Sequence, residues 1–136
     1  MSDQLAHRFP ISVKAVIQIN GKYPLLRNER NEWELPGGKL ESGEEIVACV
    51  ERETLEELGL NATATAPLNN WVYYVNGTYV VIMTYLLKAR SETQELVLSD
   101  EHKELGLFSK NEAGDLRMPE GYLRSIELAE IMLRDV

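Results

Sequence analysis

Alternating apolar and polar residues predict β-strands in the first part of the chain. In ISVKAVIQIN, residues 11–20, every odd position is apolar, which is the two-residue period of a strand. Asn20-Gly21 supplies two positions that accept positive φ angles, so residues 23–27 are predicted to return as the second strand of a hairpin. A second signal of this kind, Asn76-Gly77, separates WVYYVN from TYVVIMTYLLKA. Short extended pieces are expected at residues 33–35 and 105–108.

Two segments have the spacing of amphipathic helices instead. The first is expected to start near Gly43, with Ser42 as N-cap and Glu45 completing a capping box, and to stop at Gly59. The second opens at Pro119 and repeats apolar residues at helical spacing as far as Leu133. Strands that interleave with two helices predict an α/β or α+β fold with a sheet between helices. No repeat or linker interrupts the pattern, so we expect one domain over residues 1–136.

Composition narrows the classes of function. The chain has 22 Asp and Glu against 14 Lys and Arg, a net charge of −8, which argues against binding long nucleic acids. No apolar run is long enough to span a membrane, and nothing at the N-terminus resembles a signal peptide. The single cysteine, Cys49, excludes an internal disulfide and is typical of a protein in the reducing cytoplasm.

The first helix contains an unusual concentration of acid. Seven glutamates occur between Glu41 and Glu57. On a helical period, Glu53 and Glu57 fall inside an apolar arc that includes Val47, and Glu56 lies at its edge. Sheltered, adjacent carboxylates are costly without a cation, and Mg²⁺ or Mn²⁺ prefers oxygen ligands of this kind. The alternative is an exposed acidic helix whose Lys and Arg partners come from elsewhere.

This segment resembles the Nudix box. Gly38, then Glu44, then the run from Arg52 to Leu60, RETLEELGL, matches the family's charged and glycine positions, and Thr54 stands where an aliphatic residue is usual. The preceding WELP is also similar to the family's approach to the box. The resemblance implies an α/β/α sandwich with a mixed sheet, and hydrolysis of a nucleoside diphosphate linked to another group with Mg²⁺ or Mn²⁺ as cofactor.

The resemblance also implies roles for particular residues. Glu53, Glu56 and Glu57 would bind the metal together with the main-chain oxygen of Gly38. Arg52 would orient the cluster by pairing with a glutamate, and Glu44 would add a contact outside the ring of metal ligands. The general base is expected to be Glu53, with acids of a later loop, Glu101 and Glu104, as alternatives, whereas His102 is expected to be a loop residue without a catalytic role.

Substrate contacts are less well specified by the sequence. Arg27, Arg30 and Lys39 could reach phosphates, and Trp33, Tyr73, Tyr74 and Tyr79 could stack on a base, although strand aromatics more often pack in a core. We expect a small nucleotide, a nucleoside triphosphate or an ADP-ribose-type nucleotide sugar, as substrate. A non-catalytic nucleotide sensor of the same fold is the alternative function, and a homodimer stays open.

Overall fold

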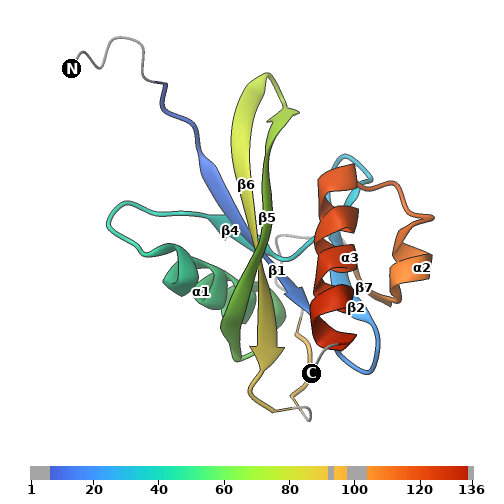
Figure 1. Ribbon diagram of the computed structural model, residues 1–136. Coiled ribbons are helices and arrows are strands. Elements are labelled where there is room, and N and C mark those ends of the chain that lie inside the picture. Colours follow the sequence, from blue (N-terminus) through green and yellow to red (C-terminus); the bar gives the residue numbers. More distant parts are fainter. Residues whose placement is uncertain (1–6, 92–93, 98–103, 135–136) are drawn as a thin grey trace.

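A mixed four-stranded sheet forms the centre of the computed structural model, which describes residues 7–91, 94–97 and 104–134 (Figure 1). Its strands are, in order, β4 (Gly37–Lys39), β1 (Ile11–Ile17), β6 (Thr78–Ala89) and β5 (Ala62–Val75). β1 runs parallel to β6 and antiparallel to β4, and β5 pairs with β6 in an antiparallel hairpin. The hairpin turns at Asn76-Gly77, as predicted, with φ angles of 51° and 77°.

A second sheet corrects the predicted pairing of the first two strands. The turn at Asn20-Gly21 is confirmed by φ angles of 52° and 77° and by a bridge between Ile19 and Lys22. Beyond that bridge, β2 (Tyr23–Arg27) leaves β1 and pairs with β3 (Trp33–Glu34) and β7 (Glu104–Phe108). The expected hairpin is therefore wrong beyond its turn. The physical reason is that both faces of β2 are buried, so the strand needs cover on two sides.

Helices cover both faces of the first sheet (Figure 1). α1 (Ile46–Leu58) packs on one face, where Val13, Ala15 and Ile17 of β1 are buried in one core. α3 (Glu120–Arg134) packs on the other face in a second core with Val16. The α/β/α sandwich with a mixed sheet is thus confirmed, and β1 is one of the two inner strands of the sheet.

The start of α1 differs from the prediction. The helix begins at Ile46, and its N-cap, Glu45, makes no side-chain capping hydrogen bond. Gly43 has a φ of 79°, outside the helical region, so Ser42 and Gly43 belong to a turn before the helix. The end is as predicted, because Gly59 is left-handed with a φ of 64°. A complete capping box occurs instead at Ser109, where it starts the short helix α2 (Lys110–Ala113).

The strand β5 (Ala62–Val75) is longer than the strand predicted from the sequence, which covered residues 71–76 alone. It extends back to Ala62 through Pro67, with register shifts against β6 on either side of that proline. Proline is tolerated here because β5 lies at the edge of the sheet. In the described part of the chain, none of the helices combines the length and apolar character needed to cross a membrane.

Candidate active site

The three box glutamates on α1 differ in exposure. Glu57 is 2% exposed, the side chain of Glu53 is 15% exposed, and that of Glu56 is 58% exposed. The predicted shelter is therefore confirmed for Glu53 and Glu57, while Glu56 lies at the solvent edge. Val47, placed on the apolar arc by the same pattern, is exposed, so that part of the prediction is wrong. The apolar arc is narrower than the sequence indicates.

The loop before α1 holds its backbone against these carboxylates. The N–H of Gly37 donates a 2.5 Å hydrogen bond to Oε1 of Glu57. A Cβ at position 38 would lie 2.3 Å from the carboxyl carbon of Glu53, so no larger residue fits there without moving that side chain. Both glycines thus permit a close contact between the loop and the acidic face of the helix.

Arg52 joins four acids of this region. Its Nε and Nη2 donate to the two carboxylate oxygens of Glu44 at 2.6 and 3.0 Å, a bidentate pair. Its Nη1 donates to Glu53 at 2.9 Å and to Glu56 at 3.1 Å, and Glu41 lies 3.7 Å from Nη2. One guanidinium therefore supplies positive charge to the cluster, with its strongest contacts to Glu44.

The pKa values of Glu53 and Glu44 are shifted in opposite directions. Burial raises the pKa of Glu53, and the neighbouring Glu57 and Glu56 raise it further against the lowering effect of Arg52, so the net pKa is above its usual value. Glu44 is the converse: the hydrogen bonds from Arg52 lower its pKa to about 2. Glu44 is therefore held in its ionised form by Arg52, whereas the surroundings of Glu53 disfavour its ionised form.

This donor set fits a hard divalent cation. Among the described residues, no three His, Cys, Asp or Glu side chains are already gathered closely enough to hold an ion. The available donors near Gly38 are nevertheless all carboxylate and carbonyl oxygens, the ligand type that Mg²⁺ and Mn²⁺ prefer. Burial is the main reason that the pKa of Glu53 is raised, and a bound cation would offset this cost of holding a charge in the sheltered site.

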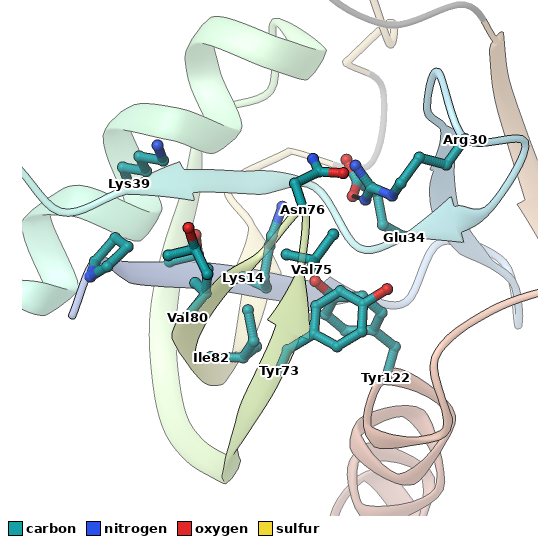
Figure 2. A pocket seen from close by; sticks show the side chains of 13 residues that line it. Lys14, Arg30, Glu34, Lys39, Tyr73, Val75, Asn76, Val80, Ile82 and Tyr122 are labelled. Atoms are coloured by element: carbon teal, nitrogen blue, oxygen red, sulfur yellow. Dashed lines mark ion pairs between the residues drawn. The ribbon is translucent and has the colours of Figure 1, made fainter.

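A cavity of about 360 Å³ lies beside this region, on the face of the first sheet that carries α3. Figure 2 shows Lys14 of β1 in its middle, with Lys39 of β4 on one side and Glu34 and Arg30 on the other. Tyr73 of β5 and Tyr122 of α3 complete its polar and aromatic lining. The volume is in the range of small-molecule sites.

Lys14 is the residue that sequence reasoning missed. Its side chain lines the cavity, although the residue is only 7% exposed. Burial lowers the pKa of Lys14, but Tyr122, Glu34, Glu57 and Glu53 raise it, and the net shift is upward. In the sequence Lys14 stands at a polar position of an alternating strand, and its burial follows from the cover on both faces of β1, which the alternation does not indicate. Tyr122 and Glu34 were also missed, and burial raises the pKa of Tyr122 to about 12.

The other predicted residues are distributed as follows. Lys39, Arg30 and Tyr73 line the cavity. Trp33 is buried in the core with its ring 4.9 Å from that of Phe108, so the structure does not bring it to the cavity.

The remaining predicted residues lie elsewhere. Arg27 pairs with Glu104 at 3.1 Å on the second sheet, and neither residue lines the cavity. Tyr74 and Tyr79 are exposed and pack against each other. Glu101 and His102 lie outside the described residues.

Comparison with known proteins finds relatives of this chain in both sequence and structure. Residues 9–128 match the NUDIX domain family. A 50-residue segment is 44% identical to a protein named 8-oxo-dGTP diphosphatase from Buchnera aphidicola subsp. Acyrthosiphon pisum (strain APS). That match covers 37% of this chain and 36% of the relative, so it spans about a third of the relative's length.

Solved structures share the whole fold. The MutT protein from Methanosarcina mazei Go1 superposes with a TM-score of 0.76 at 26% identity, over 97% of this chain and 98% of that one. A C. elegans Ap4A hydrolase, solved as a binary complex, has a TM-score of 0.82 over 93% and 99% of the two chains, and at 19% identity it supports the fold alone. Because the family match covers most of the chain and includes the glutamates of α1, this protein belongs to the Nudix family.

Proposed function

We propose that this protein hydrolyses a pyrophosphate bond in a small nucleotide, in a reaction that requires Mg²⁺ or Mn²⁺. The observation that carries the proposal is the position of the sheltered pair Glu53 and Glu57, held against Gly37-Gly38 next to a lysine-lined cavity. A pyrophosphate is strongly anionic and the chain has a net charge of −8, so cations must lie between the two.

Glu53, Glu56 and Glu57 would hold the metal, with the main-chain oxygen of Gly38. Bound there, the ion would neutralise phosphate charge and lower the pKa of a water molecule. Arg52 would give up part of its contact with Glu53 and Glu56 and remain anchored through its bidentate pair with Glu44. That anchor keeps the guanidinium beside the cluster in both arrangements.

Glu53 is the proposed general base. Water attacks phosphorus, the anhydride P–O bond breaks, the proton passes to Glu53, and the leaving phosphate departs with the bonding electrons. A general base must lie within reach of the attacking water, and Glu53 lies on the sheltered face of α1 beside Gly38. Lys14 and Lys39 line the cavity where they can contact the anionic substrate.

The substrate class is a nucleoside triphosphate or a nucleotide sugar. The name of the Buchnera relative, 8-oxo-dGTP diphosphatase, makes a nucleoside triphosphate the first compound to test. The cavity has room for one small molecule, and the acidic surface has few cations with which to bind a long polyanion.

The test is a panel of nucleoside triphosphates, ADP-ribose, nucleotide sugars, dinucleoside polyphosphates and capped RNA, assayed with Mg²⁺ and with EDTA. We expect turnover of a small nucleotide with Mg²⁺ alone, weak turnover of RNA, and ¹⁸O from labelled water in a phosphate product. Label found solely in the sugar would contradict attack at phosphorus. Tight nucleotide binding without any turnover would favour the alternative, a nucleotide sensor.

We also infer a cytoplasmic location. Cys49 is a free, buried thiol, and proteins with unpaired thiols are typical of reducing compartments. Fractionation of cells that express the tagged full chain tests this inference, and recovery in a membrane or exported fraction would contradict it.

A further inference from the structure

We propose that the cavity binds the nucleobase of the substrate and that Lys14 and Glu34 together select guanine. This assignment rests on the proposed function, because it makes the cavity the base-binding end of a nucleotide site. It is carried by the placement of an ammonium and a carboxylate in the lining of one cavity, with aromatic rings beside them (Figure 2).

Lys14 is built to contact a ligand. Its residue is more than nine-tenths buried, and among the described residues its ammonium makes no hydrogen bond or ion pair. The stem of Lys14 is covered, while its ammonium opens into the cavity and is not among the buried polar atoms that lack a hydrogen-bond partner. An ammonium donates hydrogen bonds and cannot accept them, so a molecule that fills the cavity meets Lys14 best with a hydrogen-bond acceptor.

Glu34 supplies the complementary group. Its side chain is 15% exposed and lines the same cavity from β3. Asn28 donates to its Oε2 at 3.2 Å, and Arg30 lies 4.0 Å from the same oxygen, so the carboxylate is held in place. A carboxylate accepts hydrogen bonds and cannot donate them, so a ligand meets it best with N–H or O–H donors.

Guanine has both a hydrogen-bond acceptor and hydrogen-bond donors on its Watson–Crick edge. Its O6 is an acceptor for lysine, and the adjacent N1–H and 2-amino group are two donors side by side, which match the two oxygens of a carboxylate. On the same edge adenine has the opposite order, with an amino donor facing the ammonium and a bare nitrogen facing the carboxylate. The lining therefore attracts guanine and repels adenine, which is how a site achieves specificity.

The aromatic side chains suit a base rather than a sugar. Tyr73 is fixed by the hydrogen bond that its hydroxyl donates to Glu32 at 3.2 Å, and Tyr122 packs edge-on against Trp71. Tyrosine rings stack on bases without regard to sequence, so they add affinity while Lys14 and Glu34 add selectivity. Lys39 lies away from Glu34, on the side of the cavity next to α1, where the phosphates would lie (Figure 2).

The experiment measures binding without catalysis. GMP, IMP and AMP are titrated by calorimetry, in the absence of metal, into the wild-type chain and the variants Lys14→Met, Glu34→Gln and Glu29→Gln. We expect GMP to bind wild-type protein about tenfold or more tighter than AMP, with IMP between them because it lacks the 2-amino group. Lys14→Met and Glu34→Gln should bring the GMP to AMP ratio close to one.

Glu29→Gln is the matched control, because it removes the same charge from an exposed residue outside the cavity lining and should leave the ratio unchanged. Equal binding of GMP and AMP by the wild-type chain, or an unchanged ratio in Glu34→Gln, would overturn the assignment. Glu34→Gln is isosteric, so it decides the question even if Lys14→Met does not fold. Selective GMP binding by a protein that hydrolyses no pyrophosphate would refute the proposed function and leave this inference standing.

Discussion

The N–H of Gly37 donates a hydrogen bond to the carboxylate of Glu57, twenty residues later in the chain, at a distance of 2.5 Å. This contact fixes the glycine loop to the acidic face of α1, and Glu57 is almost completely buried beside it. A glutamine at position 57 keeps the acceptor oxygen that Gly37 needs and loses the negative charge.

Glu57→Gln should therefore separate folding from activity. We expect turnover to fall about 100-fold or more, because a metal ligand loses its charge. The melting temperature of the metal-free protein should be maintained or raised, since repulsion between positions 53 and 57 is removed. Steady-state kinetics and thermal denaturation measure the two effects, and turnover close to wild type would exclude Glu57 from the metal site.

Divalent metal should stabilise the folded chain. Mg²⁺ or Mn²⁺ is expected to raise the melting temperature in a concentration-dependent way, because an ion that binds the folded state alone shifts the folding equilibrium. Zn²⁺ should substitute poorly in turnover, since every proposed ligand is a hard oxygen. Full activity in excess EDTA would contradict a metal site on α1.

Stability should respond to pH through Glu44 and Arg52. The pKa of Glu44 is lowered from 4.5 to about 2, so the stability that this pair contributes is present above pH 4.5 and is lost as the pH falls toward 2. Glu44→Gln should unfold more easily than wild type at pH 7 and match it near pH 2. Urea denaturation at several pH values checks this, and a pH-independent difference would mean that the pair contributes through packing.

In the metal-free protein, Glu53→Gln should change the folding stability in the opposite direction from Glu44→Gln. The pKa of Glu53 is raised, so its favourable contribution is present below pH 4.5 and is lost as the pH rises through the raised pKa. At neutral pH the variant should be at least as stable as wild type, while turnover falls. The same denaturation series measures it, and a clear loss of stability at pH 7 would show that the contact with Arg52 outweighs the repulsion.

Alanine substitutions at the two glycines of the loop should affect different properties, stability at position 37 and activity at position 38. In Gly38→Ala the new methyl group meets the flexible carboxylate of Glu53, so the chain should fold but lose activity. In Gly37→Ala the methyl group would lie 2.1 Å from the carbonyl oxygen of Val13 at a φ of 146°, so the fold itself should be destabilised. Gly43→Ala is the control for positive φ alone, because no atom lies near its Cβ position. Equal melting temperatures for the position 37 and 38 variants would contradict this division.

Local signals predicted much of the fold. The turns at Asn20 and Asn76 and the stop at Gly59 depend on backbone angles that few residues adopt, so the residue types alone identified them. The start of α1 was mispredicted because Glu44, placed for a first helical turn, is held by Arg52 instead, while Gly43 adopts a positive φ. A capping box in a sequence does not report such competing contacts.

The same reasoning from the sequence predicted only part of the candidate site. Glu53 and Glu57 were found because one helix carries them at a recognisable spacing. Lys14, Glu34 and Tyr122 come from β1, β3 and α3, and it is the tertiary arrangement that brings them to one cavity. Lys14 also resembles an ordinary solvent-facing strand residue until the second face of β1 is known to be covered.

The pairing of β1 with β4 sets Lys14 directly opposite Gly37. Lys14 lines the cavity, and Gly37 holds the acidic helix through Glu57, so one rung of backbone hydrogen bonds separates the two ends of the proposed site. A rung of a sheet does not stretch as a hinged loop does. The distance between the base-binding end and the metal-binding end of the proposed site would then be constant. The number of atoms between the base and each phosphate would decide which anhydride bond meets the attacking water. Lengthening the phosphate chain by one unit would move the cut along the substrate and leave the enzyme unmoved.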